Sequence, residues 1–384
     1  MKVLINGLQV NDKNSGVQYY TKHLYECIKE IQDSTIETHL YQRISKPSSQ
    51  FSIFRFYPSR LLLRWTPIYL LLSLFNGRLQ RIIKENFYLP FYIKQNSFDL
   101  FHSPNYVLPL FLKSPSVITV HDLITFNFPR LCQRESVLYF RLFLPRSIKK
   151  ADKIITVSEK TKNDIINRFK VPEDKISIIH LGLSTVFRRT RNTNLLLKYG
   201  ITNKYILFVG NIEPKKNLVR LLKAYYEVVC TKNITHQLVI AGKKAWKYKE
   251  VFRTVHSLKL QNKVIFTGYF PEKDLPALYS MADLFVFPSI YEGFGIPPLE
   301  AMACEIPVLA SNTGALPEIT GGNCLMVDPY NVNDIADGIH HLLTNENLRK
   351  EYIKKGKKWV EQYTWDRAAR MTIEVYEEVG KRKR

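Results

Sequence analysis

Short runs rich in Val, Ile and Phe alternate along the chain with longer segments in which apolar residues recur at helical spacing. This alternation is typical of βαβ units, whose parallel strands are covered by helices on both faces. It predicts an α/β protein with two series of six strands, at residues 2–6, 38–42, 100–102, 117–121, 153–157 and 176–180, and then at 205–210, 237–242, 263–268, 284–288, 307–310 and 324–327.

A polar, irregular stretch separates the two series at residues 181–204 and reads as a linker. Doubly wound domains bind ligands at the carboxyl ends of their strands. We therefore expect two Rossmann-like domains that face one another across a cleft holding the active site. The predicted parts are a first domain at 1–185, a linker at 186–204, a second domain at 205–365, and a C-terminal helix with a basic tail at 366–384 that packs back on the first domain.

The charge of the chain indicates an anionic partner. Its 384 residues include 56 Lys and Arg against 34 Asp and Glu, a formal net charge of +22. Nucleic acid, an acidic membrane surface and a phosphorylated substrate all fit such a charge. Residues 43–94 are basic at nine positions, acidic only at Glu85, and rich in aromatic residues. This segment either lies on an anionic membrane, which we favour, or forms core helices with solvated cations. No nucleic-acid module is recognisable, so we expect no nucleic-acid partner.

Cysteine usage and the first residues bear on location. The five cysteines are scattered without a CxxC pair, which favours a reducing cytoplasm. The opening residues 1–7 lack the features of a signal peptide. The most apolar stretch, 65–75, is shorter than the roughly 18 to 20 residues that span a bilayer. We expect a cytoplasmic protein.

The most informative stretch is residues 287–304. A predicted strand ends at Pro288, a glycine-rich turn follows, and a helix begins near Pro297, where proline is favoured. Uncovered backbone N–H groups and the helix dipole can hold a phosphate there without Lys or Arg. Glu292 lies in the turn, and Glu300 lies one turn into the helix, where its carboxylate would suit ribose hydroxyls. In isolation, either acid could equally be an ordinary helix-start residue.

The spacing Glu292-x7-Glu300 lies within Tyr-Glu-Gly-Phe-Gly-Ile-Pro-Pro-Leu-Glu-Ala-Met-Ala, and residues 310–318 follow it directly. This segment resembles the signature of family 4 retaining glycosyltransferases of the GT-B fold. The resemblance implies an N-terminal domain that binds the acceptor and a C-terminal domain that binds a nucleotide sugar. It implies that Glu292 contacts the donor sugar and Glu300 the nucleotide ribose. The turn residues expected to bind the donor are Gly293, Phe294 and Gly295.

Residues 209–217, Val-Gly-Asn-Ile-Glu-Pro-Lys-Lys-Asn, are similar to the family segment that clamps the donor diphosphate. The resemblance implies that Lys216 and Lys215 contact phosphate, where Lys acts as a point charge. Asn211 stands at the donor site where many members have Arg. Taken without the resemblance, the two lysines read as solvated helix-start residues.

Two N-terminal segments also match. His121, in Val-His-Asp-Leu at 120–123, corresponds to a family residue that faces the donor sugar near the reacting carbon. A lone His after a strand is otherwise more often structural. Asp122 either orients His121 or caps the following segment. Residues 14–20, which contain Gly16, resemble the glycine-rich first loop of the family, near the diphosphate and acceptor. Many relatives have two glycines there, whereas this chain has one.

Several motifs are missing from the sequence. It holds no Asp-x-Asp, no GxxxxGK[ST] and no GxGxxG, which argues against a metal-diphosphate site, phosphoryl transfer and dinucleotide redox chemistry. We therefore expect a metal-independent enzyme without a cofactor. Lys216, backbone N–H groups and the helix dipole would stabilise the leaving diphosphate.

Within the family, the sequence looks most like the mannosyltransferases of bacterial O-antigen and capsule assembly. We predict a retaining hexosyltransferase that moves mannose from GDP-mannose to a lipid-linked or surface-polysaccharide acceptor, such as that of O-antigen, capsule or lipopolysaccharide, at the inner face of a membrane. Retention through same-face attack is favoured over a covalent intermediate. The alternatives are a UDP-sugar-dependent transferase of the same fold, a nucleotide-sugar epimerase and a non-enzymatic binder of anionic surfaces.

Overall fold

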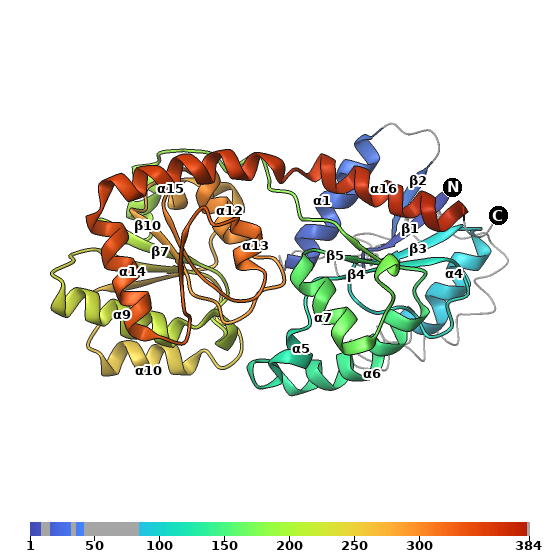
Figure 1. Ribbon diagram of the computed structural model, residues 1–384, viewed down its shortest axis with the longest axis horizontal. Coiled ribbons are helices and arrows are strands. Elements are labelled where there is room, and N and C mark those ends of the chain that lie inside the picture. The colour runs from blue at the N-terminus through green and yellow to red at the C-terminus, as the bar shows by residue number, and fades with distance from the viewer. Residues whose placement is uncertain (9–15, 32–35, 42–83, 382–384) are drawn as a thin grey trace, which may run out of the picture. The chain divides into compact units, whose positions relative to one another are not determined.

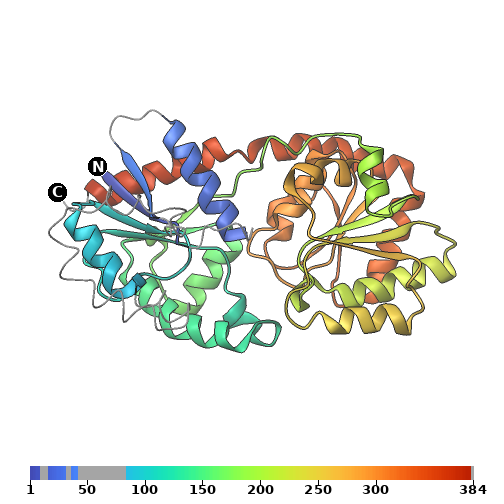
Figure 2. The same cartoon turned by 180° about the vertical axis from the view of Figure 1, so that it is seen from behind.

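The computed structural model describes residues 1–8, 16–31, 36–41 and 84–381, which form two six-stranded parallel sheets flanked by helices (Figures 1 and 2). All twelve predicted strands are present, with ends shifted by at most two residues. They are β1 (Lys2–Asn6), β2 (Glu37–Tyr41), β3 (Leu100–Ser103), β4 (Ser116–Val120), β5 (Lys153–Thr156), β6 (Ile176–Ile178), β7 (Tyr205–Val209), β8 (Gln237–Ala241), β9 (Val264–Gly268), β10 (Leu284–Phe287), β11 (Val308–Ser311) and β12 (Leu325–Val327).

Helices connect most of the strands, as the βαβ rhythm predicts. They are α1 (Gly16–Glu30), α4 (Leu89–Gln95), α5 (Ile124–Asn127), α6 (Arg134–Lys150), α7 (Glu159–Phe169), α8 (Thr193–Lys198), α9 (Leu218–Thr231), α10 (Lys249–Ser257), α11 (Leu275–Ser280), α12 (Ile296–Ala303), α13 (Leu316–Thr320), α14 (Val332–Thr344), α15 (Glu346–Trp359) and α16 (Trp365–Lys381). The last three make the chain largely helical from Val332 to Lys381.

The second sheet has the strand order β12-β11-β10-β7-β8-β9. Its direction of winding reverses between β7 and β10, which pair in parallel through Leu284 with Ile206 and Phe285 with Leu207. Both strands are buried along nearly their whole length, which explains their continuous apolar sequences. The carboxyl ends of β7 and β10 flank the switch point where doubly wound sheets bind ligands.

The first sheet has the order β2-β1-β3-β4-β5-β6. The C-terminal part of α16 is tied to it by two polar contacts. The Tyr376 hydroxyl lies 2.7 Å from Nδ1 of His102 in β3, and Lys153 Nζ of β5 lies 2.8 Å from the Glu378 carboxylate. His102 and Tyr376 are completely buried, so this contact lies inside a core.

Contacts between Cα atoms divide the chain into two compact units. Unit 1 comprises Met1–Thr119, Phe143–Ile155 and Ala369–Arg384, and unit 2 comprises Val120–Leu142 and Thr156–Ala368. The domain boundaries given above stay predictions. Within the expected linker, the structure adds the short helix α8, because the Asn192 side chain caps its start by accepting from the Leu195 amide and Leu196 is buried.

Most of the basic segment 43–94 lies outside the described residues, as do the apolar stretch 65–75 and the tail at 382–384. Its described end, 84–94, includes most of α4, which buries Leu89 and Ile93. Phe91 of α4 and Phe87, which precedes it, are exposed. Within the described ranges, none of the helices combines the length and the apolar character that crossing a membrane requires.

Candidate active site

Two loops meet at the switch point of the second sheet. One follows β7 and contains Lys215 and Lys216, and the other joins β10 to α12 and contains Glu292. The Ile290 amide of the second loop donates to the Lys215 carbonyl of the first, at 2.8 Å. This bond fixes the two predicted donor-binding segments against one another, as their positions after neighbouring strands require.

The first loop is held by Asn217, which begins α9 in the left-handed conformation at φ 60°. Its side-chain amide donates to the Pro288 carbonyl at 3.0 Å and to the Pro329 carbonyl at 2.6 Å. Asn tolerates this backbone conformation better than most residues. Asn217 ends the motif at 209–217, and its side chain binds the loops together, a role that the motif alone does not indicate.

The second loop is shaped by its glycines. Gly295 has φ 102°, and a Cβ atom there would lie 2.5 Å from the Leu316 side chain. A Cβ atom on Gly314 would lie 2.8 Å from the Glu292 backbone. The Ala315 amide donates to the Glu292 carbonyl at 3.0 Å, so the segment after β11 helps to hold the Glu292 loop in place. The helix α12 starts at Ile296, one residue before the expected Pro297.

Glu292 forms a buried ion pair. Lys216 donates from Nζ to Glu292 Oε1 at 2.6 Å, and Lys215 Nζ lies 3.5 Å from Oε2 of the same carboxylate. Glu213 lies 3.9 Å from Lys215 and is also buried. Burial alone would raise the pKa of Glu292, but the two lysines outweigh it and lower the pKa to about 2. The carboxylate therefore stays ionised at neutral pH.

The other two titratable groups of this cluster respond differently. Burial raises the pKa of Glu213, against the lowering effect of both lysines. Burial opposes the charge of Lys215, but Glu292, Asp122 and Glu213 raise its pKa above the ordinary value. The two lysines and the Glu292 carboxylate together carry a formal charge of +1, and burial of Glu213 favours its neutral form.

Glu300 lies in α12 and is buried. It accepts a hydrogen bond from the hydroxyl of Tyr279, in α11, at 2.7 Å. Burial raises the pKa of Glu300 to about 7, although the tyrosine bond lowers it in part. The local spacing could not have revealed Tyr279, because it comes from a different helix 21 residues earlier.

His121 follows β4 directly, at the expected place. Its carbonyl accepts from Thr161 Oγ1 at 3.2 Å, and a Cβ atom on Gly293 would lie 1.8 Å from the same carbonyl oxygen. The backbone at His121 therefore touches the backbone beside Glu292. Asp122 Oδ1 accepts from the Ile124 amide at 3.1 Å, so Asp122 caps the start of α5.

The remaining predicted donor residues occupy varied positions. The Phe294 ring is buried between His180 and Tyr363, with ring centroids 5.9 Å from each, so only its backbone can face a ligand. Asn211 is exposed at the start of the first loop. Gly16 is exposed at the first residue of α1 and belongs to unit 1, whereas the other predicted site residues belong to unit 2. The roles assigned to all these residues stay predictions.

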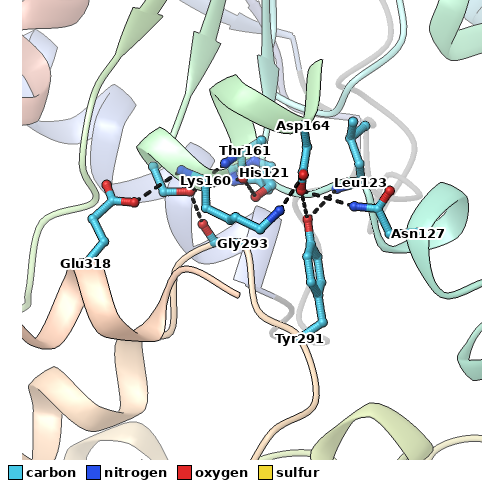
Figure 3. Close-up of polar contacts among 10 residues, drawn as sticks. His121, Leu123, Asn127, Lys160, Thr161, Asp164, Tyr291, Gly293 and Glu318 are labelled. Carbon is cyan, nitrogen blue, oxygen red and sulfur yellow. Dashed lines mark hydrogen bonds and ion pairs between the residues drawn. The ribbon is translucent and has the colours of Figure 1, made fainter. Parts of the chain in front are cut away.

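Contacts that sequence reasoning missed surround the Glu292 loop. Tyr291 donates its hydroxyl to Asp164 Oδ2 at 2.7 Å, and the Ser158 hydroxyl donates to the Gly293 carbonyl at 2.7 Å (Figure 3). The partners are separated by 127 and 135 residues, so no local pattern connects them. Among the described residues, no group of three or more His, Cys, Asp or Glu side chains is arranged to hold a metal ion.

Solved structures with the same architecture identify the class of fold. A structure of Anabaena Alr3699/HepE in complex with UDP-glucose superposes with a TM-score of 0.73 at 16% identity, covering 98% of this chain and 100% of that one. WaaG, a glycosyltransferase involved in lipopolysaccharide biosynthesis, superposes with a TM-score of 0.67 at 16% identity, covering 97% and 99%. The two sheets thus define a GT-B fold, as expected from the resemblance.

Sequence comparison defines the family. Residues 198–359 match the model of glycosyl transferases group 1, and residues 21–187 match that of glycosyltransferase family 4. O-antigen chain mannosyltransferase B of Escherichia coli is 33% identical over 281 residues, which cover 72% of this chain and 74% of that protein. The chain belongs to glycosyltransferase family 4.

Two further relatives carry related names. O-antigen chain mannosyltransferase RfbU of Salmonella typhimurium is 29% identical over 279 residues, 73% of each chain. The serotype-specific mannosyltransferase WbdA of Escherichia coli is 30% identical over 269 residues, which are 68% of this chain. The chain matches only about a third of the length of WbdA, 33%.

Proposed function

We propose that this glycosyltransferase is a retaining, metal-independent mannosyltransferase that uses GDP-mannose and a lipid-linked or surface-polysaccharide acceptor of O-antigen type. The observation that carries the proposal is the buried cluster of Lys215, Lys216 and Glu292 at the switch point of the second sheet. The names of the relatives supply the sugar and the acceptor class.

The cluster can exchange one anionic partner for another. A donor diphosphate brings negative charge to the cluster and competes with Glu292 for Lys216 and Lys215. Lysine binds phosphate as a point charge from a flexible stem, so a small movement of Nζ suffices. The Glu292 carboxylate then becomes available to accept hydrogen bonds from the hydroxyls of the sugar. Backbone N–H groups of the turn at 293–296, before Pro297 and Pro298, complete the phosphate site.

Same-face attack fits this cluster better than a covalent intermediate. A carboxylate that is hydrogen-bonded to one lysine, lies near a second and has a pKa of about 2 is a weak nucleophile. In the proposed step, the bond between the sugar C1 and the phosphate oxygen breaks, and the acceptor oxygen bonds to C1 on the same face. The acceptor proton passes to the leaving phosphate oxygen. Lys216 and the backbone N–H groups stabilise the charge that develops there.

Sugar transfer tests the proposal directly. Purified chain is incubated with GDP-mannose, UDP-glucose or UDP-galactose and a lipid-linked oligosaccharide acceptor, with and without EDTA, and the product is analysed by mass spectrometry and NMR. We expect a mannosylated product with retained anomeric configuration that EDTA does not suppress. Transfer from a UDP-sugar alone would replace the donor, and isomerised nucleotide sugar formed without acceptor would indicate an epimerase.

Two carboxylate variants provide the matched comparison. Glu292→Gln should lower turnover by roughly 100-fold or more, because it removes a charge that acts on the reacting sugar. Glu346→Gln is the control, because Glu346 is exposed on α15 and pairs only with its helix neighbour Lys350 among the described contacts. Equal, small effects of both changes would reject the assignment of Glu292.

We also propose that the chain works peripherally at the inner face of a membrane. The net charge of +22 and the basic segment 43–94 support this location. Cosedimentation with vesicles should occur with anionic phospholipid, should fail with zwitterionic phospholipid, and should weaken in high salt. Equal binding to both kinds of vesicle would contradict the electrostatic basis of the proposal.

A further inference from the structure

The residues on either side of Glu292 are held by side chains from a distant part of unit 2. Glu292 itself faces Lys216 and Lys215, whereas Tyr291 and Gly293 are bound by the segment 156–169, which contains the helix α7. All of these residues belong to unit 2. The position of the Glu292 carboxylate is thus fixed from two directions.

Tyr291 makes the first contact with α7. Its buried hydroxyl donates to Asp164 Oδ2 at 2.7 Å, and the same carboxylate accepts from Asn127 Nδ2 at 3.0 Å and pairs with Lys160 (Figure 3). The Tyr291 ring also packs against Phe128, with ring centroids 5.4 Å apart. Burial, reinforced by Asp122 and Asp164, raises the pKa of Tyr291 above its ordinary value, so the hydroxyl remains a donor.

Gly293 makes the second contact. Its carbonyl accepts from Ser158 Oγ at 2.7 Å, and Ser158 in turn caps α7 by accepting from the Thr161 amide at 3.1 Å. The 1.8 Å approach that a Cβ on Gly293 would make to the His121 carbonyl means that a side chain does not fit there. The start of α7, the end of β4 and the Glu292 loop are therefore in direct contact.

Glu318 makes the third contact, from α13. Its two carboxylate oxygens accept from the amides of Glu159 at 2.8 Å and Lys160 at 3.2 Å, at the start of α7. His180 Nε2 lies 3.1 Å from the same carboxylate. A carboxylate at this place satisfies helix N–H groups and interacts favourably with the helix dipole. Figure 3 shows Glu318, Gly293 and Tyr291 reaching the same segment at separate points.

We infer that α7 is a template that sets the position of Glu292 for sugar transfer, with Tyr291 and Asp164 as positioning residues. The inference rests on the proposed function of Glu292 at the donor sugar. Neither residue needs to touch the substrate, because each acts through the backbone of the loop. A small displacement of a reacting group can lower the rate about 100-fold. Loss of the Tyr291 contact should therefore lower kcat.

Tyr291→Phe removes the hydroxyl and keeps the ring against Phe128. We expect kcat for sugar transfer to fall by roughly 10-fold to 100-fold, with KM for the donor changed less than about twofold. Tyr225→Phe is the matched control, because the Tyr225 hydroxyl is also buried and donates to a carbonyl, that of His236, at 2.7 Å, away from the Glu292 loop. Equal losses of kcat in the two variants would overturn the inference.

Variants at Asp164 separate positioning from folding. Asp164→Asn keeps an oxygen that accepts from Tyr291 and should retain most of the activity. Asp164→Ala should lose at least as much as Tyr291→Phe, because it also removes the partner of Asn127 and Lys160. The double variant Tyr291→Phe/Asp164→Ala should lose less activity than the sum of the two single losses, because both changes remove the bond between Tyr291 and Asp164. Additive losses in the double variant would show that the two residues act separately.

Amide hydrogen exchange provides a readout that needs no activity. Peptides covering residues 288–295 should exchange at least about 5-fold faster in Tyr291→Phe than in the wild-type chain, because the hydroxyl that donates to Asp164 and accepts from the Leu123 amide at 3.4 Å is lost. Tyr225→Phe should leave their exchange unchanged. Unchanged exchange in Tyr291→Phe would overturn the template, even if the wild-type chain transferred no sugar. Failure of transfer by the wild-type chain, with the expected exchange difference, would reject the proposed function and leave the template in place.

Discussion

The buried pair of Glu292 and Lys216 gives a sharp prediction about stability. Glu292→Gln leaves Lys216 Nζ without the carboxylate that it contacts at 2.6 Å, in a place where both residues are at most 9% exposed. Lys216→Met removes the cation and keeps a side chain of similar length. Removing one member of a buried ion pair leaves the charge of the other buried without that partner, so each single change should destabilise the chain.

The magnitude follows from the pKa. The pKa of Glu292 is lowered from 4.5 to about 2. A lowering of this size corresponds to roughly 3 kcal/mol of favourable interaction with the ionised carboxylate. This agrees with the roughly 3 to 5 kcal/mol lost when a buried pair is broken. The double variant Glu292→Gln/Lys216→Met should lose less than the sum of the single changes, with a coupling of about 2 kcal/mol.

Urea unfolding at several pH values measures these differences. A carboxyl group with a lowered pKa stabilises the fold above its unfolded pKa and loses that effect as the pH falls through the folded value. The contribution of Glu292 should therefore be complete above about pH 4.5 and decrease towards pH 2. The exposed pair Glu346 and Lys350 on α15 serves as control, with a coupling below about 0.5 kcal/mol. A coupling near zero for Glu292 and Lys216 at pH 7 would refute the reasoning.

Four further predictions concern Glu300, which is expected to bind ribose, and the loop glycine Gly293. Burial raises the pKa of Glu300 to about 7, so the native state binds this proton more tightly than the unfolded state does. The free energy of unfolding should therefore fall as the pH rises from about 4.5 to 7. Calorimetry at pH 8 should find Glu300→Gln more stable than the wild-type chain. If the ionised Glu300 binds ribose, nucleotide affinity should rise through pH 7 in the wild-type chain and stay flat in Glu300→Gln, as titration calorimetry would show. Tyr279→Phe removes the bond that lowers this pKa, so the rise in affinity should move to higher pH. Gly293→Ala would place a methyl group 1.8 Å from the His121 carbonyl oxygen. Urea unfolding should show a loss of at least about 1 to 3 kcal/mol in the free energy of unfolding. A variant as stable as the wild-type chain would contradict the close approach.

The strands could be predicted because their signal is local. Parallel strands covered on both faces consist of short apolar runs, and each of the twelve runs stands out between helical or polar segments. The helix α8 was missed because its six residues are too few for a periodic pattern, and its start depends on one side chain, Asn192. The switch point between β7 and β10 depends on which strands pair, and local sequence does not reveal strand pairing.

Residues of the site divide in the same way. Lys216, Glu292 and Glu300 lie in motifs that follow predicted strands, so their neighbourhood could be inferred. Their mutual contacts could not, because Lys216 and Glu292 are 76 residues apart and meet through the register of β7 and β10. The resemblance predicts that Glu292 and Lys216 contact the donor, but it does not show that they bind one another.

That pairing bears on how a chain with Asn211, where many relatives have Arg, can bind a diphosphate. Glu292 holds Lys216 and attracts Lys215, so the positive charge of the site is gathered by a carboxylate that phosphate can replace. An arginine at position 211 would add charge at an exposed place, whereas phosphate at the buried lysines would lie in surroundings that screen charge less. Introducing Asn211→Arg should therefore strengthen nucleotide binding less than Lys216→Met weakens it. A larger gain from Asn211→Arg would show that the buried cluster is not the main phosphate site.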